Sequence, residues 1–166
     1  MLLQKNDSPR FVNPVQTWST GVLAGLAGGA AEVLWIVIYQ QLAGGEAANV
    51  ARGVTAVVFP GLAMPTVAVP LGVAIHMGLA ILLGIAVAVF VRAGLPRGAP
   101  AALEPLAVVG LLVLVWAMNF LVILPAINPA FVETVPYSVS LTSKVLFGVA
   151  AALALKLFGG PRPSDA

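Results

Sequence analysis

Residues 21–39 read GVLAGLAGGAAEVLWIVIY, a long apolar stretch with one carboxylate, Glu32, well inside it. In an α-helix, which turns about 100° per residue, Glu32 shares a face with three glycines and Tyr39, and Trp35 lies at the edge of that face. A carboxylate inside a membrane-length stretch is costly unless it has a partner. We therefore predict a membrane-spanning helix with a buried polar site at Glu32. The three glycines are Gly21, Gly25 and Gly28.

The composition of the whole chain is typical of an all-α integral membrane protein. Of its 166 residues, 60% are hydrophobic and only 8% are charged, whereas about 25% are charged in soluble domains. The mean hydropathy is +1.05. Four stretches are long and apolar enough to span a bilayer. We predict a single membrane domain over residues 1–166, with helices at about 18–42, 66–91, 105–125 and 137–158.

The segment at about 46–59 is apolar but too short to cross the membrane again. Its valines follow helical spacing, while Glu46, Asn49 and Arg52 take another face. This pattern favours a short helix that lies in the membrane interface, and we place it on the outer face. The β-branched valines leave a second possibility open, a re-entrant hairpin that dips toward Glu32.

The positively charged residues indicate the orientation of the chain. With four crossings, six of the eight Lys and Arg residues fall on one side of the membrane. Cytoplasmic loops are enriched in these residues, so we predict that both termini are cytoplasmic, in a bacterial-type inner membrane. A fifth crossing would break this segregation. The six residues are Lys5, Arg10, Arg92, Arg97, Lys156 and Arg162, whereas Arg52 lies on the other side and Lys144 within the membrane.

Each predicted span contributes one hydrogen-bonding or ionisable group at a similar depth. Glu32 and His76 are roughly 15 Å from the outer ends of their helices, and Asn119 and Lys144 roughly 10 Å. Because such groups rarely face lipid, we predict a polar cluster in the outer half of the bundle. Glu32 pairs there with Lys144 or with His76, either as a carboxylate or as a neutral donor to His76. The flanking aromatics are Trp35, Tyr39 and Trp116, and the hydroxyl partners are Ser138, Ser140, Thr142 and Ser143.

Small residues at four-residue intervals form ridges on the predicted helices. Such ridges let another helix backbone approach closely. We predict that they pack the bundle, and they are equally suited to contacts with a second copy or with other membrane subunits. The glycines predicted for helix packing are Gly21, Gly25, Gly28, Gly72, Gly84 and Gly148.

Several kinds of chemistry are disfavoured. The chain has no cysteine, and one histidine and one glutamate at the same depth are too few ligands for zinc or iron. We predict no cofactor; copper held with Met77 and Met118, or haem held by histidines of two chains, are the remote alternatives. No catalytic set is present, so we predict no enzyme. The basic residues are too few and scattered for nucleic-acid binding.

Two functions remain from different classes. The first is a non-enzymatic accessory or assembly subunit of a larger membrane complex or homo-oligomer, favoured by the short loops and glycine ridges. The second is a small proton- or cation-linked transporter or channel, favoured by the convergence of polar groups at one depth. In that case Glu32 is the protonatable group, His76 and Asn119 line the path, and Lys144 is the counter-charge.

Overall fold

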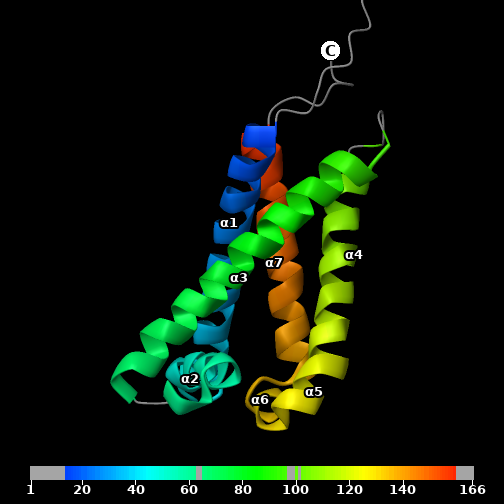
Figure 1. Ribbon diagram of the computed structural model, residues 1–166. Coiled ribbons are helices and arrows are strands. Elements are labelled where there is room, and N and C mark those ends of the chain that lie inside the picture. Colours follow the sequence, from blue (N-terminus) through cyan, green and yellow to red (C-terminus); the bar gives the residue numbers. More distant parts are fainter. Residues whose placement is uncertain (1–13, 63–64, 97–99, 101, 160–166) are drawn as a thin grey trace, which may run out of the picture.

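The computed structural model describes residues 14–62, 65–96, 100 and 102–159, and this part of the chain consists of helices joined by short turns, with no strand. Four long helical segments run through the molecule (Figure 1). They are α1 (Pro14–Leu42), α3 (Pro65–Gly94), the succession of α4 (Leu103–Ala117), η2 (Met118–Ile123) and α5 (Leu124–Ile127), and α7 (Tyr137–Phe158). The shorter elements are α2 (Ala47–Val58), η1 (Pro60–Leu62) and α6 (Pro129–Thr134).

The prediction of an all-helical chain with four spans is confirmed. Each long segment is long and apolar enough to cross a membrane. Each also leaves a large leucine on its outer surface: Leu34 is 61% exposed, Leu79 58%, Leu114 68% and Leu153 54%. Soluble proteins rarely leave so much apolar surface in water, whereas lipid covers it without cost. The exposed surface of the bundle is thus suited to a bilayer.

The helices begin and end where the local sequence favours it. Proline is the first residue of α1, α3 and α6, and its fixed φ angle and missing N–H suit that position. Helix α1 includes the residues from Pro14 onward, so the predicted span from about residue 18 lies within it. The turn after α1 contains Gly44 with φ of 72°, a conformation that glycine adopts without strain.

Helix α1 is the centre of the bundle and packs against α3 on one side and α7 on the other. Helix α4 packs against α7, while α3 diverges from α4 toward the end at which α2 lies (Figure 1). The described ends of the chain, Pro14 and Gly159, lie together at the opposite end, near the C-terminal end of α3. The four segments therefore run alternately down and up.

The backbones of α1 and α3 touch at a pair of glycines. A Cβ atom on Gly84 would overlap the backbone of Gly25, and one on Gly25 would lie 2.5 Å from Ile81 Cα. A Cβ on Gly21 would lie 2.6 Å from Ile85 Cα. Distances this short leave no room for a side chain, so glycine is what permits the crossing of these two helices.

The other three predicted packing glycines also lie at contacts inside the chain. Gly28 faces the ring of Phe147 on α7, and Gly148 faces Val109 of α4. Gly72 of α3 faces the carbonyl group of Ala51 on α2. The six glycines are thus used to bring helices of one chain together.

The larger hydrophobic core fills the half of the bundle near the described chain ends. It joins residues of α1, α3, α4 and α7 around Phe147, whose side chain is fully buried. A smaller cluster lies toward the other end, where Trp35, Tyr39 and Phe131 pack around Val50, Val135 and Val139. The larger cluster contains Ala24, Ala80, Val87, Ala88, Val91, Val108, Leu112, Phe147, Ala151, Ala152, Ala154 and Leu155.

Helix α2 lies across the end of the bundle and is seen almost along its axis in Figure 1. Its buried residues, Val50 and Thr55, face the spans, and its main contact is with α3. The hydroxyl group of Thr55 donates to the carbonyl of Ala68 at 2.5 Å. On its polar side, Arg52 donates to Asn49 at 2.6 Å and lies 3.9 Å from a carboxylate oxygen of Glu46. The predicted segment therefore forms one amphipathic helix.

Candidate functional site

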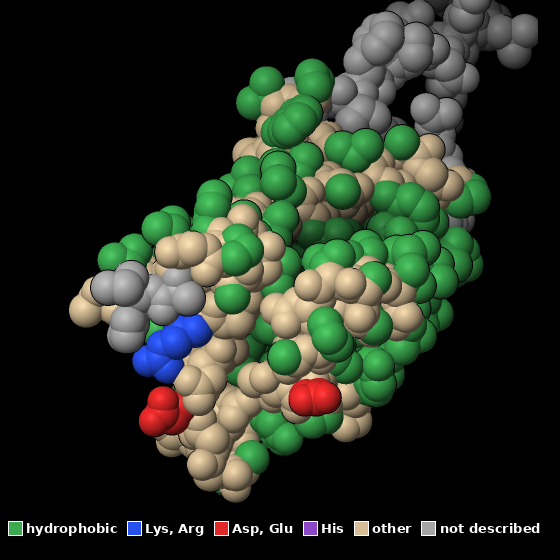
Figure 2. Space-filling view, turned by 60° about the horizontal axis from the view of Figure 1, so that its bottom comes forward, with side chains coloured by type: hydrophobic (Ala, Val, Ile, Leu, Met, Phe, Trp, Pro, Cys, Tyr) green, Lys and Arg blue, Asp and Glu red, His purple; other side chains and the backbone are tan. Residues whose placement is uncertain are grey.

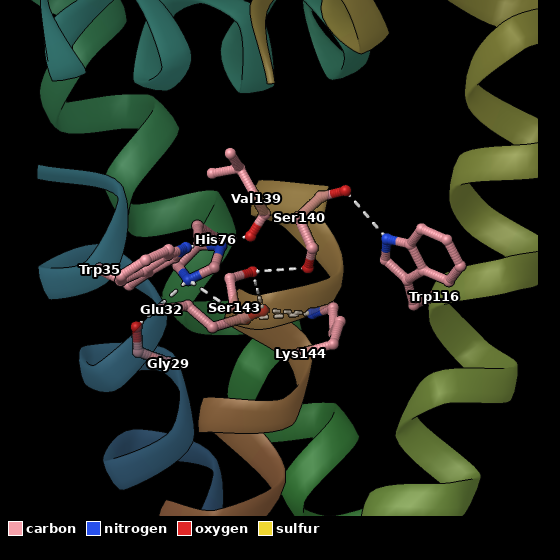
Figure 3. A network of polar contacts seen from close by, with 9 residues as sticks. All are labelled: Gly29, Glu32, Trp35, His76, Trp116, Val139, Ser140, Ser143 and Lys144. Atoms are coloured by element: carbon pink, nitrogen blue, oxygen red, sulfur yellow. Dashed lines mark hydrogen bonds and ion pairs between the residues drawn. The ribbon is translucent and has the colours of Figure 1, made fainter. Parts of the chain in front are cut away.

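The carboxylate of Glu32 is buried between helices and is paired with a lysine. Glu32 is 4% exposed. Lys144 Nζ lies 2.8 Å from Glu32 Oε1 and 3.1 Å from Oε2, so the ammonium group bonds to both oxygens (Figure 3). Hydrogen bonds between two charged groups are the strong ones. This pair, one group from α1 and one from α7, is the centre of the site.

Ser143 adds a second donor to the same carboxylate. Its hydroxyl oxygen lies 3.0 Å from Glu32 Oε1 and also 3.0 Å from the carbonyl of Ser140. A hydroxyl group has one hydrogen to donate, so it serves either the carboxylate or its own helix. Ser143 can therefore release Glu32 without leaving its hydrogen unpaired.

His76 approaches the pair from α3 at a greater distance. Its Nε2 atom lies 3.8 Å from Glu32 Oε2 and 3.4 Å from the carbonyl of Gly29 (Figure 3). Both neighbours are acceptors, which indicates a hydrogen on Nε2. Of the two partners predicted for Glu32, Lys144 makes the short contact and His76 the long one.

Asn119 does not bond to Glu32, His76 or Lys144, although all four residues line one cavity, which is described below. Within the part of the chain that the structure describes, no hydrogen bond joins its amide to Glu32, His76 or Lys144. It lies in η2, a π-helical segment of six residues between α4 and α5. Such segments change the direction of the side chains that follow and are frequent at functional sites.

Two tryptophans hold the start of α7 in place. Trp35 Nε1 donates to the carbonyl of Val139 at 3.0 Å, and Trp116 Nε1 donates to the hydroxyl of Ser140 at 2.9 Å (Figure 3). The same hydroxyl donates to the carbonyl of Tyr137 at 3.0 Å. Both tryptophans thus bond to residues one turn from Ser143 and Lys144, and they position the donors of Glu32.

Three residues assigned to this region from the sequence lie elsewhere. Tyr39 packs in the apolar cluster around Val50 and makes no contact with the ion pair among the described residues. Ser138 is exposed, and Thr142 donates back to the carbonyl of Ser138 at 2.8 Å. Intramembrane hydroxyls commonly bond to their own helix in this way, and the sequence alone does not show which ones do.

Phe147 is a member of the site that the sequence analysis missed. Lys144 Nζ lies 5.3 Å from the centre of its ring, within the range of a cation–π interaction. The sequence does contain a signal for this contact: Phe147 follows Lys144 by three positions, and side chains at this spacing on a helix are neighbours. The same ring packs on Gly28, so Phe147 links the ion pair to the contact between α1 and α7.

A cavity of about 710 Å³ lies beside the ion pair. It is bounded by α1, α2, α3, α7 and the segment from Val115 to Ile127, and its walls are mostly valine, alanine, leucine and isoleucine. Glu32, His76, Ser143 and Lys144 lie at its polar end. Its lining residues Leu79 and Ile123 are 58% and 43% exposed, so the cavity opens sideways between α3 and η2. Figure 2 shows a hollow among hydrophobic side chains at this end.

The chemistry open to this site is that of a buried ion pair next to a histidine. Among the described residues, no group of three or more His, Cys, Asp or Glu side chains could hold a metal ion. The groups present can exchange protons and can bind a charged or hydrogen-bonding ligand.

Comparison of the chain with models of known families, with curated proteins and with solved structures finds no match. The class of the protein follows from its own architecture: a helical chain with four segments able to span a membrane, arranged around a buried Glu–Lys pair.

Proposed function

We propose that this protein is a small proton-linked membrane transporter in which Glu32 binds and releases the coupling proton. The observation that supports this is the position of the Glu32–Lys144 pair at the polar end of a cavity that opens to the surroundings. Ionisable groups inside membrane segments usually mark ion or proton pathways. A pair that served only to fix helix order would not need a cavity beside it.

Protonation of Glu32 would switch the site between two arrangements. While Glu32 is ionised, Lys144 has its counter-ion at 2.8 Å. A neutral Glu32 no longer compensates the charge of Lys144, and an uncompensated charge away from water is strongly unfavourable. Lys144 must then move or accept another anion. In that state Ser143 can donate its hydroxyl hydrogen to the carbonyl of Ser140 instead of to Glu32. The hydroxyl group of Ser143 therefore keeps a hydrogen-bond partner.

His76 is placed to carry the proton. Its ring lines the cavity and its side chain is 28% exposed, while Nε2 lies 3.8 Å from Glu32 Oε2. Proton transfer requires a heavy-atom distance of about 2.6–3.2 Å, so a small rotation of the ring suffices. His76 thereby connects the open part of the cavity with the buried carboxylate.

The described arrangement favours a carrier over an open channel. The large apolar core fills the half of the bundle that contains the described chain ends, and the cavity extends from it, at Ala80, into the other half. Passage across the membrane therefore needs a second arrangement that opens toward the chain ends, as alternating access requires.

We also propose the placement of the protein in a bacterial-type inner membrane with the described chain ends on the cytoplasmic side. The Lys and Arg distribution along the sequence supports it. The cavity and α2 then belong to the outer half, and α2 lies in the outer interface with Glu46 and Arg52 toward water.

The assembly-subunit hypothesis stays a prediction with weaker support. It relied on glycine ridges that are free to bind a partner. The six predicted glycines instead lie at contacts within the chain, so a partner would have to bind other surfaces.

Transport can be tested with purified protein in liposomes that contain a pH-sensitive dye. A panel of inorganic cations, small organic acids and amines is added outside, and the internal pH is followed. We expect a proton flux with at least one compound for the wild type and for Glu133→Gln, an exposed acid far along the chain. Glu32→Gln and the charge-balanced Glu32→Gln/Lys144→Gln should match empty liposomes.

Two outcomes of that experiment would count against a transporter. One is the absence of any proton flux from folded wild-type protein across the whole panel. The other is an unchanged flux in Glu32→Gln, which would place the coupling proton elsewhere. Elution as a single species in size-exclusion chromatography and an unchanged helical circular dichroism spectrum establish that each variant is folded.

A further inference from the structure

We propose that the cavity binds an amphiphilic monocarboxylate, with its head group on Lys144 and its apolar chain directed toward the opening between α3 and η2. This inference rests on the proposed transport function, since it names the substrate class of the same site.

The polarity of the cavity is divided along its length. Its polar end holds Glu32, His76, Ser143 and Lys144, and its remaining walls are almost wholly apolar. Binding pockets for small molecules are typically about 300–1,000 Å³, and the volume here is about 710 Å³. A ligand with one polar head and one apolar chain matches this division. The apolar walls include Val33, Val37, Val54, Val69, Val73 and Leu79.

The charged groups within reach of a ligand are donors. The side chain of Glu32 is 5% exposed, compared with 15% for Lys144 and 28% for His76. The ammonium group has three hydrogens to donate and no acceptor, and Asn119 adds an amide on the same wall. Glu32 lies at the same end but is the least exposed of the three, and it already accepts from Lys144 and Ser143. A head group that accepts hydrogen bonds and is anionic therefore fits better than a cation.

One negative charge can replace another at this site if a proton accompanies it. When a carboxylate binds to Lys144, Glu32 loses its counter-ion and takes up one proton, either from the incoming neutral acid or from water by way of His76. The ligand becomes the carboxylate of the pair and Glu32 the neutral acid. The net charge of the buried site is unchanged, which avoids the cost of an unpaired charge.

This exchange selects a carboxylate over a phosphate head. A carboxylate carries one charge and replaces Glu32 one for one, whereas a phosphate monoester carries about 1.5–2 charges near neutral pH. The second charge would have no counter-ion among the groups at the polar end. The binding of a carboxylate together with one proton is also the coupling that a proton-linked carrier requires.

The test uses radiolabelled octanoate as the probe and purified full-length protein in a mild detergent. We expect saturable binding of one octanoate per chain. Palmitate should compete with octanoate. Methyl octanoate, octylamine, octyl phosphate and acetate should compete at least about tenfold more weakly, because each lacks either the single negative charge or the apolar chain. Competition by palmitate embedded in nanodiscs distinguishes a ligand from the bilayer from one that arrives through water.

Proton uptake on octanoate binding distinguishes Glu32→Gln from the wild type. Wild-type protein in weakly buffered solution should take up one proton for each octanoate anion bound. Glu32→Gln frees Lys144 from its competitor, so octanoate should bind at least as tightly while the proton uptake disappears. Glu32→Gln/Lys144→Gln should lose octanoate binding. A purely structural ion pair predicts instead that both variants behave alike.

A pair of variants tests the apolar part without touching the charges. Val73→Trp places a large ring in the cavity and should weaken octanoate binding at least about tenfold. Leu114→Trp is the matched control, since Leu114 is 68% exposed and does not line the cavity. This pair keeps the inference testable if the charge variants fail to fold.

The inference is overturned if folded wild-type protein does not bind octanoate, if octylamine binds more tightly, or if Glu32→Gln abolishes binding. These results leave the transport proposal to the liposome measurement. If octanoate binds but the liposomes show no proton flux, the inference about the ligand is supported and the transport proposal is wrong.

Discussion

At the scale of single residues, the buried carboxylate of Glu32 has three polar neighbours at different distances. Lys144 contacts both oxygens of Glu32, Ser143 donates to one of them, and His76 is held at 3.8 Å. A carboxylate in an apolar surrounding is stable only when such donors compensate it. The order of these distances makes Lys144 the residue on which the folded state of this site depends most.

Removal of Lys144 alone should therefore destabilise the protein strongly. Lys144→Gln leaves Glu32 as an uncompensated buried charge, at a cost of about 3–5 kcal/mol. The charge-balanced Glu32→Gln/Lys144→Gln should be less destabilised than this single variant. Lys156→Gln is the control because Lys156 is exposed at the end of α7. Thermal unfolding in detergent, followed by tryptophan fluorescence, gives the comparison, and a double variant as unstable as the single one would contradict it.

At the scale of helices, glycine decides which pairs approach closely. Helices α1 and α3 meet backbone to backbone at Gly25 and Gly84, and α2 meets α3 at Gly72. In lipid, where burial of apolar surface gives little driving force, such close packing carries much of the attraction between helices. The close crossing of α1 and α3 leaves α3 free to diverge from α4 farther along, and this divergence forms the cavity.

Two of the glycines of α3, Gly78 and Gly84, provide a matched test of this packing. A Cβ on Gly84 would overlap the backbone of Gly25, whereas a Cβ on Gly78 would meet nothing within 4 Å. We expect Gly84→Leu to destabilise the fold by about 1–3 kcal/mol or more. Gly78→Leu should be neutral or slightly stabilising, since leucine favours helices over glycine. Equal thermal stabilities of the two variants would show that the glycine contact does not hold the helices together.

At the scale of the whole molecule, the polar site and the cavity extend through one half of the bundle and the apolar core through the other, and they meet at Ala80 and Phe147. The core half contains both described chain ends, which are held together there: Arg92 of α3 donates to the carbonyl of Gly159, and Thr20 of α1 lies 3.4 Å from the carbonyl of Phe158. The bond from Arg92 satisfies a carbonyl group at the C-terminal end of α7 that has no partner in its own helix, whereas the hydroxyl of Thr20 makes its shorter bond, of 2.7 Å, to the carbonyl of Gln16.

The proposed orientation can be tested by labelling introduced cysteines, because the chain has no cysteine of its own that would give background labelling. Single-cysteine variants Glu46→Cys and Lys156→Cys place a thiol at exposed positions at opposite ends of the bundle. We expect a membrane-impermeant maleimide to label Glu46→Cys in intact cells or right-side-out vesicles, and Lys156→Cys only after permeabilisation. Labelling of both thiols from one side would contradict four crossings, and the reverse pattern would contradict the orientation.

The sequence alone was sufficient to predict the helical class and four helices long and apolar enough to span a membrane. Length and composition decide these features, because every backbone group in a bilayer must be satisfied within its own helix. Several features depended on how the helices are packed. They include the short contact of Glu32 with Lys144 rather than His76, the location of Tyr39 in an apolar cluster, and the hydroxyl bonds of Ser140, Thr142 and Ser143.

The tertiary structure alone decided what the glycines contact and where the cavity lies. A glycine ridge has the same sequence whether it binds α3 of the same chain or a second protein, so Gly25 and Gly84 could be matched only in three dimensions. The cavity likewise exists because α3 and α4 diverge, and no local pattern encodes the angle between two distant helices. Glu32 had to have a partner by the physics of burial; its partners and their access to the surroundings followed from long-range packing.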